Sequence, residues 1–196
     1  RRTEEFLKEK YGTVRHGLNK EVFDVAAELG IPTERIGNNI IVRSRKWADS
    51  RPTILLNSHH DTVKPASGYT KDPFNPEITD GILYGLGSND AGGSLVALIA
   101  TFLHLYNHDL GYNLILVASA EEEISGPNGI AAVRDKIASI DLGIIGEPTQ
   151  MRMAIAEKGL MVVDGEAIGK SGHAAREEGI NAIYIALKDI DWLGNY

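Results

Sequence analysis

The chain contains no cysteine, which excludes a disulfide framework and also a thiolate acting as nucleophile or metal ligand. It also lacks a basic tract, and its formal net charge of -7 at pH 7 argues against a nucleic-acid-binding surface. Its longest apolar stretch, around Leu95 to Leu105, is shorter than a membrane span and contains Thr101 and His104. We therefore expect a cytoplasmic protein with no nucleic-acid or membrane partner, in which any metal ion binds through His, Asp and Glu.

Apolar runs alternate along the chain with segments of helical periodicity. Helices are predicted over 19–29, 91–106 and 128–138, and strands over 39–42, 53–57, 113–120 and 141–146. This alternation predicts an α/β domain of three layers with a mixed, largely parallel sheet. The segment 91–106 is apolar nearly all round, so we expect a helix buried in the centre of the domain. A long polar loop is predicted over 64–80.

Polar and acidic residues lie just past the ends of three of the predicted strands. His59 follows the first, the acidic run Glu121 to Glu123 follows the second, and Glu147 follows the third. Open α/β sheets place their functional sites at the carboxyl ends of the strands. The sequence therefore predicts that these side chains share one edge of the sheet.

Two of the candidate clusters have an ordinary structural interpretation as well. In the triplet from His59 to Asp61, an imidazole can bind a metal while a carboxylate orients the ring, but His and Asp are also common in turns. Asp90 lies in a glycine-rich corner directly before a predicted helix, where it is either an N-cap or a carboxylate that bridges two ions.

The acidic run is the most specific local feature. Three adjacent carboxylates repel one another unless cations neutralise them. One Glu would bind a metal while its neighbour takes the proton from the attacking water, although a solvated acidic turn is the alternative. His104 and His108 have a helical spacing of four residues, but Leu105 stands where a zinc-binding HExxH motif has Glu, so we interpret the pair as structural.

Four segments, SHHDTV, GILYGLGSNDAGG, ASAEEEISG and IIGEPT, follow one another in an order and spacing that resembles the M20 metallopeptidase family, from about Asn38 to Ala175. The resemblance implies two divalent metal ions, with Zn²⁺ expected first and Co²⁺ or Mn²⁺ as alternatives. It implies a small-molecule N-acyl amino acid or a short peptide as substrate. The site residues it implies are His59, Asp90, Glu123 and Glu147 as metal ligands, Asp61 as the carboxylate that orients His59, and Glu122 as the catalytic base.

The resemblance also implies a division into domains. Residues 1–158 correspond to the N-terminal part of a catalytic domain, and 159–196 to the start of a smaller α+β lid and dimerisation domain, with a first strand over 160–169 and a first helix over 181–193. His173, in SGHAA, resembles a lid His that contacts the substrate carbonyl oxygen of the partner subunit. A homodimer of the full-length protein is therefore expected, whereas without the resemblance His173 would be an ordinary surface histidine.

The chain departs from the family in length. Family members are about twice as long, and their C-terminal part supplies one more metal-binding His, whereas no His follows His173 here. Three hypotheses remain. The first is an acetylornithine deacetylase-like hydrolase of arginine biosynthesis, the second is an M20 peptidase, carboxypeptidase or desuccinylase of other specificity, and the third is a catalytically incomplete binding module.

Overall fold

The computed structural model describes residues 26–195 apart from 157, 160, 174 and 177. The chain forms two compact units, Arg1–Met153 and Ala154–Tyr196, and each is described here by itself. The predicted domain boundary after residue 158 stays a prediction. The predicted helix over 19–29 lies mostly outside the described residues, and 26–28 are helical.

The N-terminal unit is built on a five-stranded sheet with the order β1-β2-β6-β3-β7. Its strands are β1 (Thr33–Ile36), β2 (Asn39–Arg43), β3 (Thr53–His59), β6 (Asn113–Ser119) and β7 (Leu142–Ile145). β3 pairs in parallel with both β6 and β7, while β2 pairs antiparallel with both β1 and β6. Only β2 therefore runs against the other strands, which confirms the predicted mixed, largely parallel sheet.

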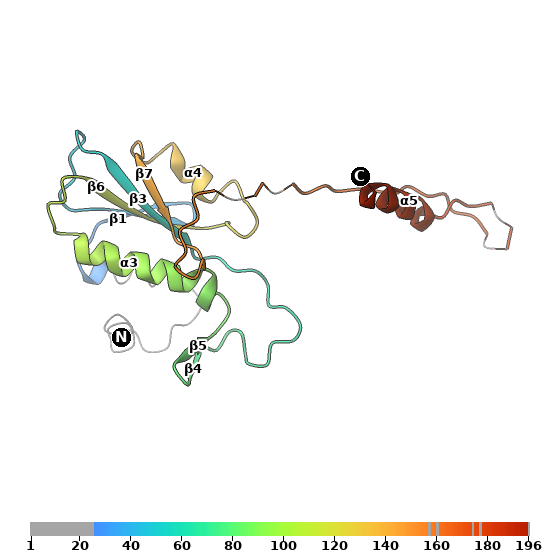
Figure 1. Ribbon diagram of the computed structural model, residues 1–196, viewed down its shortest axis with the longest axis horizontal. Helices are drawn as coiled ribbons and strands as arrows, with labels where there is room; N and C mark the ends of the chain where they lie inside the picture. The colour runs from blue at the N-terminus through green and yellow to red at the C-terminus, as the bar shows by residue number, and fades with distance from the viewer. Residues whose placement is uncertain (1–25, 157, 160, 174, 177, 196) are drawn as a thin grey trace. The chain divides into compact units, whose positions relative to one another are not determined.

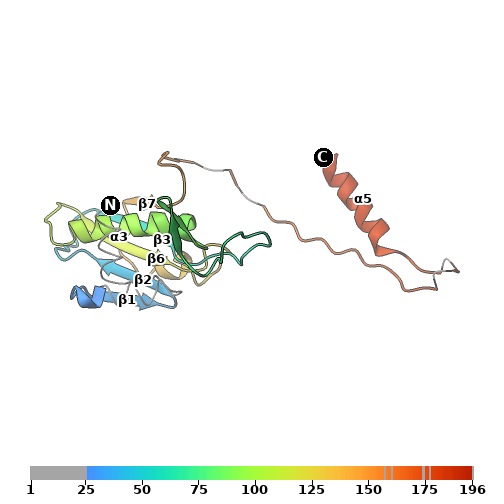
Figure 2. The same cartoon turned by 90° about the horizontal axis from the view of Figure 1, so that it is seen from below.

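Helices cover both faces of this sheet. Helix α3 (Ser94–Leu105) lies on one face and the short helix α4 (Ile130–Arg134) on the other (Figures 1 and 2). Phe102 of α3 packs in one cluster with Leu116, whereas Val133 of α4 packs in a second cluster with Val117, the next residue of β6. Because successive side chains of a strand point to opposite faces, the sheet supplies both cores, and the predicted three layers are confirmed.

Two helix predictions need correction. Helix α3 is not buried all round, because Ala97, Thr101 and His104 are exposed at a spacing that follows one helix face. The helix covers the sheet from outside, so only its inner face is enclosed. Helix α4 spans five residues, which is shorter than the predicted 128–138.

The end of the predicted polar loop forms the first strand of a hairpin. Strands β4 (Glu77–Thr79) and β5 (Ile82–Tyr84) pair antiparallel around Asp80 and Gly81, which both have positive φ. An Asp-Gly pair favours this two-residue turn, so the sequence carried a signal that the loop prediction missed. A single-turn segment, η1 (Ser88–Gly93), then leads into α3, and its Asp90–Ala91 peptide bond is cis.

The C-terminal unit contains helix α5 (Ala182–Gly194). The side chain of Asn181 accepts a hydrogen bond from the backbone N–H of Ile183 at 3.0 Å and so caps the helix, which confirms the prediction over 181–193. The predicted strand over 160–169 is wrong for the described residues 161–169, which are irregular. A strand needs a hydrogen-bonding neighbour, and the pairing found here is the isolated bridge between Lys170 and Ile180.

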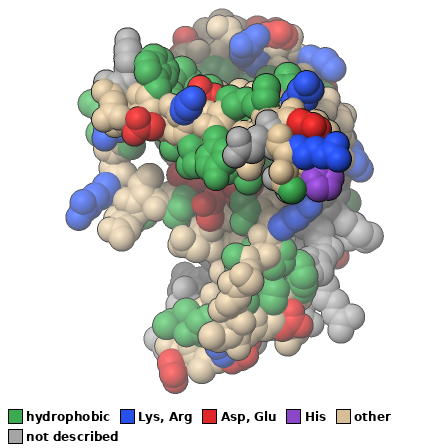
Figure 3. Space-filling view, turned by 90° about the vertical axis from the view of Figure 1, so that its right-hand side faces the viewer, with side chains coloured by type: hydrophobic (Ala, Val, Ile, Leu, Met, Phe, Trp, Pro, Cys, Tyr) green, Lys and Arg blue, Asp and Glu red, His purple; other side chains and the backbone are tan. Residues whose placement is uncertain are grey.

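Several large apolar side chains of the C-terminal unit are exposed. Ile183, Leu187 and Ile190 follow one another along one face of α5, and each is more than half exposed. In the space-filling view, hydrophobic side chains gather in patches between acidic and basic ones (Figure 3). Among the described residues, no helix has the length and apolar character needed to cross a membrane.

Candidate metal centre

The site lies at the carboxyl ends of three neighbouring strands. His59 is the last residue of β3 and pairs with Ser119, the last residue of β6. The acidic run begins at Glu121, shortly after β6, and Glu147 follows β7 on the other side of β3. The parallel register of these strands therefore brings together the segments that the sequence singled out.

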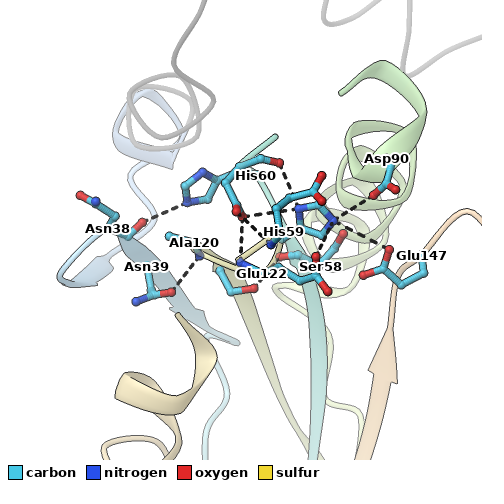
Figure 4. Close-up of polar contacts among 12 residues, drawn as sticks. Asn38, Asn39, Ser58, His59, His60, Asp90, Ala120, Glu122 and Glu147 are labelled. Atoms are coloured by element: carbon cyan, nitrogen blue, oxygen red, sulfur yellow. Dashed lines mark hydrogen bonds and ion pairs between the residues drawn. The ribbon is translucent and has the colours of Figure 1, made fainter. Parts of the chain in front are cut away.

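His59 forms the centre of the cluster. Its side chain is 1% exposed, and its Nε2 lies 3.0 Å from Oδ1 of Asp90. The same nitrogen lies 3.8 Å from Oε2 of Glu122 and 3.8 Å from Oε2 of Glu147. In Figure 4 Asp90 approaches the ring from the start of the helix, and Glu147 approaches it from the end of β7. Three carboxylates thus surround one imidazole nitrogen.

The same arrangement brings in Glu123. One ligand atom each from His59, Asp90 and Glu123 lies within 4.8 Å of the other two. Imidazole nitrogen together with carboxylate oxygens is a donor set that suits Zn²⁺ and accepts other divalent transition metals. With Glu147 at 3.8 Å from the histidine nitrogen, the residues present fit a metal site with carboxylates on several sides.

The opposite nitrogen of His59 is held by Asp61. Nδ1 lies 3.1 Å from the backbone carbonyl oxygen of Asp61 and 3.5 Å from its Oδ1. An Nδ1–H that donates to this carbonyl leaves the lone pair on Nε2, which is the tautomer that binds a metal through Nε2.

The carboxylate of Asp61 makes a second connection. Its Oδ1 accepts the backbone N–H of Glu122, and its Oδ2 accepts that of Glu123, both at 3.2 Å. The sequence interpretation gave Asp61 only the role of orienting His59. In the structure this residue also fixes the backbone of the acidic run relative to β3.

Electrostatics at the cluster indicate an excess of negative charge. Burial lowers the pKa of His59, but Glu147, the hydrogen bond to Asp61, and the Asp90 and Glu122 carboxylates together raise this pKa above its ordinary value. The pKa of Glu147 is also raised, first by burial and then by the neighbouring carboxylates, although His59 opposes the shift. A bound cation would relieve this repulsion between carboxylates.

One acid of the run has a structural role. Glu121 has a φ of 57°, and its carboxylate accepts hydrogen bonds from the backbone N–H of Asn128 at 3.0 Å and from the Asn128 side chain at 3.1 Å. These bonds close the turn after β6. Glu121 therefore serves the loop, and it leaves Glu122 and Glu123 for the cluster.

The interpretation of Asp90 as a helix cap is wrong. The cap position of α3 is Gly93, which makes no side-chain cap bond, and Asp90 has non-helical backbone angles. The carboxylate of Asp90 faces His59 instead. His104 and His108 have ring centroids 5.6 Å apart, but neither belongs to a three-ligand group among the described residues.

Sequence reasoning missed two residues that hold the site in place. Asn39 of β2 accepts the backbone N–H of Ala120 at 2.9 Å and donates to the backbone carbonyl of Asn128 at 2.7 Å. Ser58 donates from its Oγ to the carbonyl of Gly146 at 2.8 Å, directly before Glu147. Both are buried polar residues in apolar strands, a signal that could have identified them.

Two further histidines, His173 and His60, have hydrogen-bond partners of their own. His173 belongs to the C-terminal unit, where its Nδ1 accepts the backbone N–H of Ala175 at 3.2 Å, and its contact with substrate stays a prediction. His60 donates from Nε2 to the carbonyl of Asn38 at 3.0 Å. Burial lowers the pKa of His60.

The sequence of this chain matches a known protein family. Residues 55–185, more than half of the chain, match the profile of peptidase family M20/M25/M40. The chain belongs to peptidase family M20. Enzymes of this family are metal-dependent peptidases and amidohydrolases, so the cluster around His59 falls in a family whose chemistry requires metal.

Relatives with two different names match this chain at similar identity. Acetylornithine deacetylase of Edwardsiella ictaluri is 32% identical over 157 residues, which are 79% of this chain and 40% of that protein. Succinyl-diaminopimelate desuccinylase 2 of Ruegeria sp. is 30% identical over 179 residues, which are 84% of this chain and 45% of that protein. The chain thus spans less than half the length of these relatives.

Solved structures support the fold. Aminopeptidase PepT of Bacillus cereus superposes with a TM-score of 0.56 at 22% identity, covering 96% of this chain and 55% of that one. The M20 family metallo-carboxypeptidase Sso-CP2 of Sulfolobus solfataricus superposes with a TM-score of 0.51 at 23% identity, covering 65% of this chain and 31% of that one.

Proposed function

We propose that the chain is part of a dinuclear-metal amidohydrolase that cleaves the amide bond of an N-acyl amino acid, in the manner of an acetylornithine deacetylase. The observation that carries this proposal is the convergence of Asp90, Glu122 and Glu147 on Nε2 of the buried His59. The relatives named acetylornithine deacetylase support the choice of substrate.

The ligand assignment follows the donor set. His59, Asp90 and Glu147 would hold one ion, and Asp90 and Glu123 would contribute to a second, with Zn²⁺ preferred and Co²⁺ or Mn²⁺ as alternatives. When bound, the ions polarise the scissile carbonyl and lower the pKa of the attacking water toward neutrality.

Glu122 would move the proton. Its side chain is about half exposed, at 53%, and it stands beside the cluster with its Oε2 3.8 Å from the His59 ring. This position lets its carboxylate take a proton from the attacking water and return it to the leaving amine. Asp61 orients both Glu122 and His59, since its carboxylate accepts the Glu122 backbone N–H and its backbone carbonyl binds the His59 ring.

The C-terminal unit would contribute to binding. We propose that residues 159–196 begin a lid domain and that His173 stabilises the oxyanion on the substrate of a partner subunit in a homodimer. A cytoplasmic role in arginine biosynthesis belongs to the same proposal.

Two alternatives lead to different results. The relative named succinyl-diaminopimelate desuccinylase is nearly as similar, so a desuccinylase or an M20 peptidase is the second candidate. A binding module that keeps the fold without catalysis is the third.

The test is a substrate panel on the full-length, zinc-loaded protein. Hydrolysis of N-acetylornithine at a higher kcat/KM than N-succinyl-diaminopimelate or dipeptides, abolished by a chelator and restored by zinc, is the expected result. Preference for another of these substrates would favour the second candidate function, a desuccinylase or an M20 peptidase. Bound zinc without turnover of any of these amides would leave the binding module.

A further inference from the structure

Two exposed histidines lie at the end of α3 and take no part in the mechanism above. His104 is in the last turn of the helix. His108 follows one turn later, where its backbone N–H donates to the carbonyl of Leu105 at 2.9 Å. The centroids of the two rings are 5.6 Å apart. The spacing of four residues therefore places both imidazoles on one side of the chain.

Both rings are available to a ligand. Among the described residues, neither imidazole forms a hydrogen bond or an ion pair, and the aromatic contact of each ring is with the other. Two polar neighbours already have partners. Asn107 accepts a hydrogen bond from Arg45 at 3.3 Å, and Asp109 pairs with Arg51 at 2.8 Å. Within the part of the chain that the structure describes, the two imidazoles therefore remain open as donors at this end of the helix.

The separation of the rings is close to that of two imidazoles on one metal ion. A bond of about 2.0–2.1 Å from the ion to a ring nitrogen places each ring centroid about 3.2 Å from the ion. Bond angles between a square-planar and a tetrahedral arrangement then place the two centroids about 4.5–5.2 Å apart. Since both side chains are exposed, a small rotation closes the remaining gap without displacing packed residues.

The surroundings also suit a cation. The carbonyl end of a helix carries partial negative charge, which attracts a positive ion. Because both histidines are exposed, an ion bound there keeps water on its other coordination positions and loses little hydration. The charge of Arg51 is offset by Asp109, whereas Arg45 adds one positive charge. We therefore expect weaker binding here than at the carboxylate-rich centre around His59.

The pair is separate from the metal centre at His59. Ser94 and His104 are ten residues apart in α3, and a rise of about 1.5 Å per residue separates them by about 15 Å along the helix axis. Arg51, which pairs with Asp109, precedes β3, whereas His59 ends that strand. The pair therefore lies toward the amino ends of the strands, opposite the edge that carries the carboxylates.

We propose that His104 and His108 form a further, two-imidazole site for a late divalent transition metal ion, with water completing the coordination. Imidazole nitrogen suits Ni²⁺, Cu²⁺ and Zn²⁺, and Cu²⁺ binds most tightly in this series. Leu105 in place of the HExxH glutamate excludes a protease-type centre, but it does not bear on a site that only binds an ion. The inference goes beyond the proposed function and holds whether or not the chain cleaves amides.

The probe is Ni²⁺, added to the full-length protein after the centre around His59 has been loaded with zinc. Equilibrium dialysis at a pH where imidazole is neutral measures the bound nickel, and elemental analysis of the same samples measures the retained zinc. We expect about one nickel ion per chain in addition to the zinc. Because residues that only support a ligand change metal affinity by about tenfold or more, His104→Gln and His108→Gln should each weaken nickel binding at least about tenfold.

Two further variants test the geometry. Thr101→His adds a third imidazole on the same exposed face, one turn before His104, so nickel should bind more tightly. His173→Gln removes an exposed histidine whose Nδ1 accepts the Ala175 backbone N–H, and it should leave nickel binding unchanged. Thermal unfolding confirms that each variant is folded.

Nickel binding distinguishes a chelating pair from two rings that only stabilise the helix. Nickel affinity that neither His104→Gln nor His108→Gln changes would overturn the proposal, whatever the two variants do to thermal stability. Nickel that binds only by displacing zinc would overturn it too. A loss in one variant alone would assign the ion to a single exposed histidine and would also contradict the pair. Amide hydrolysis is not measured in these experiments, so failure of the proposed function leaves their result unaffected.

Discussion

Nε2 of His59 lies 3.0 Å from Oδ1 of Asp90, although 31 residues separate them in the sequence. The contact joins the end of a central strand to the segment that leads into α3. Since Asp90 is exposed and His59 is buried, the pair forms the boundary between the protein interior and the open side of the site. This boundary is where a metal ion can both reach its ligands and meet a substrate.

Replacing either residue of this pair should lower the zinc content of the protein. We expect Asp90→Ala and His59→Ala each to lower the zinc content of the purified, zinc-saturated protein substantially, because each deletes one of the donor atoms that would hold the ion. Elemental analysis measures the ratio of zinc to protein. Glu121→Gln is the matched control, since its carboxylate binds Asn128 instead. An unchanged zinc content in Asp90→Ala would contradict the ligand assignment.

Glu122 should be required for turnover but not for metal binding. Glu122→Gln keeps the size of the side chain but removes its basicity, so we expect kcat to fall by about 100-fold or more while the zinc content stays at the wild-type level. Steady-state kinetics and elemental analysis on the same sample check both parts. Wild-type kcat in this variant would exclude Glu122 as the base.

Asp61 should stabilise the folded state as well as the site. Its two oxygens accept the N–H groups of Glu122 and Glu123, so Asp61→Ala leaves two donors without this partner. We expect a loss of about 1–3 kcal/mol in the free energy of unfolding, measured by urea denaturation of the metal-free protein. Asp61→Asn keeps one acceptor oxygen and should lose less. Equal stability of all three proteins would count against this role.

Gly87 offers a test of close packing. Gly87→Ala would set a methyl group 2.4 Å from Thr62 Cγ2 in a left-handed backbone conformation, and we expect a destabilisation of about 1–3 kcal/mol. Gly37→Ala has a similar φ of +60° with nothing within 4 Å, so it measures the backbone strain alone. Combining Thr62→Ser with Gly87→Ala should recover the stability that Gly87→Ala loses beyond the loss in Gly37→Ala. A double-mutant cycle that finds no coupling would refute the contact.

The stability of the β4–β5 hairpin should depend on pH. The pKa of Glu77 is lowered, first by its hydrogen bond from Lys71 and then by that from Thr79. A lowered pKa in the folded state means that the contribution to stability is present above the ordinary Glu pKa and is lost as pH falls through the folded value. An NMR titration should find this carboxyl below its ordinary pKa, and Lys71→Met should return it toward that value. No change in Lys71→Met would show that the ion pair is not formed in solution.

Most of the site residues could be predicted because they lie at the ends of strands. β3 continues through Ser58 and His59, two residues beyond its predicted end at Asn57, so His59 is its last residue, and Glu147 follows β7 as expected. Asp90 was ambiguous, because a carboxylate before a helix is also the pattern of an N-cap, and only the path of the backbone decides between them. Local sequence does not encode that path.

Other features depend on contacts that no local pattern records. The bonds from Asp61 to Glu122 and Glu123 span about 60 residues. The segment 161–169 begins with the apolar residues Met161, Val162 and Val163, which favour a strand, but it lacks a partner strand among the described residues. The sequence pattern alone therefore predicted a strand that does not form. The outer face of α3 was misjudged because Ala97 is apolar and yet exposed, and alanine is compatible with either environment.

The order of the strands has a consequence for how the protein matures. β3 pairs with β6, about 60 residues later in the chain, and then with β7, about 90 residues later, so the ligands come together only after long-range pairing is complete. An unfolded or partly paired chain holds the same side chains too far apart to share an ion. Zinc uptake during refolding would therefore follow closure of the sheet, and the rate at which the ion is captured would report the slowest pairing step.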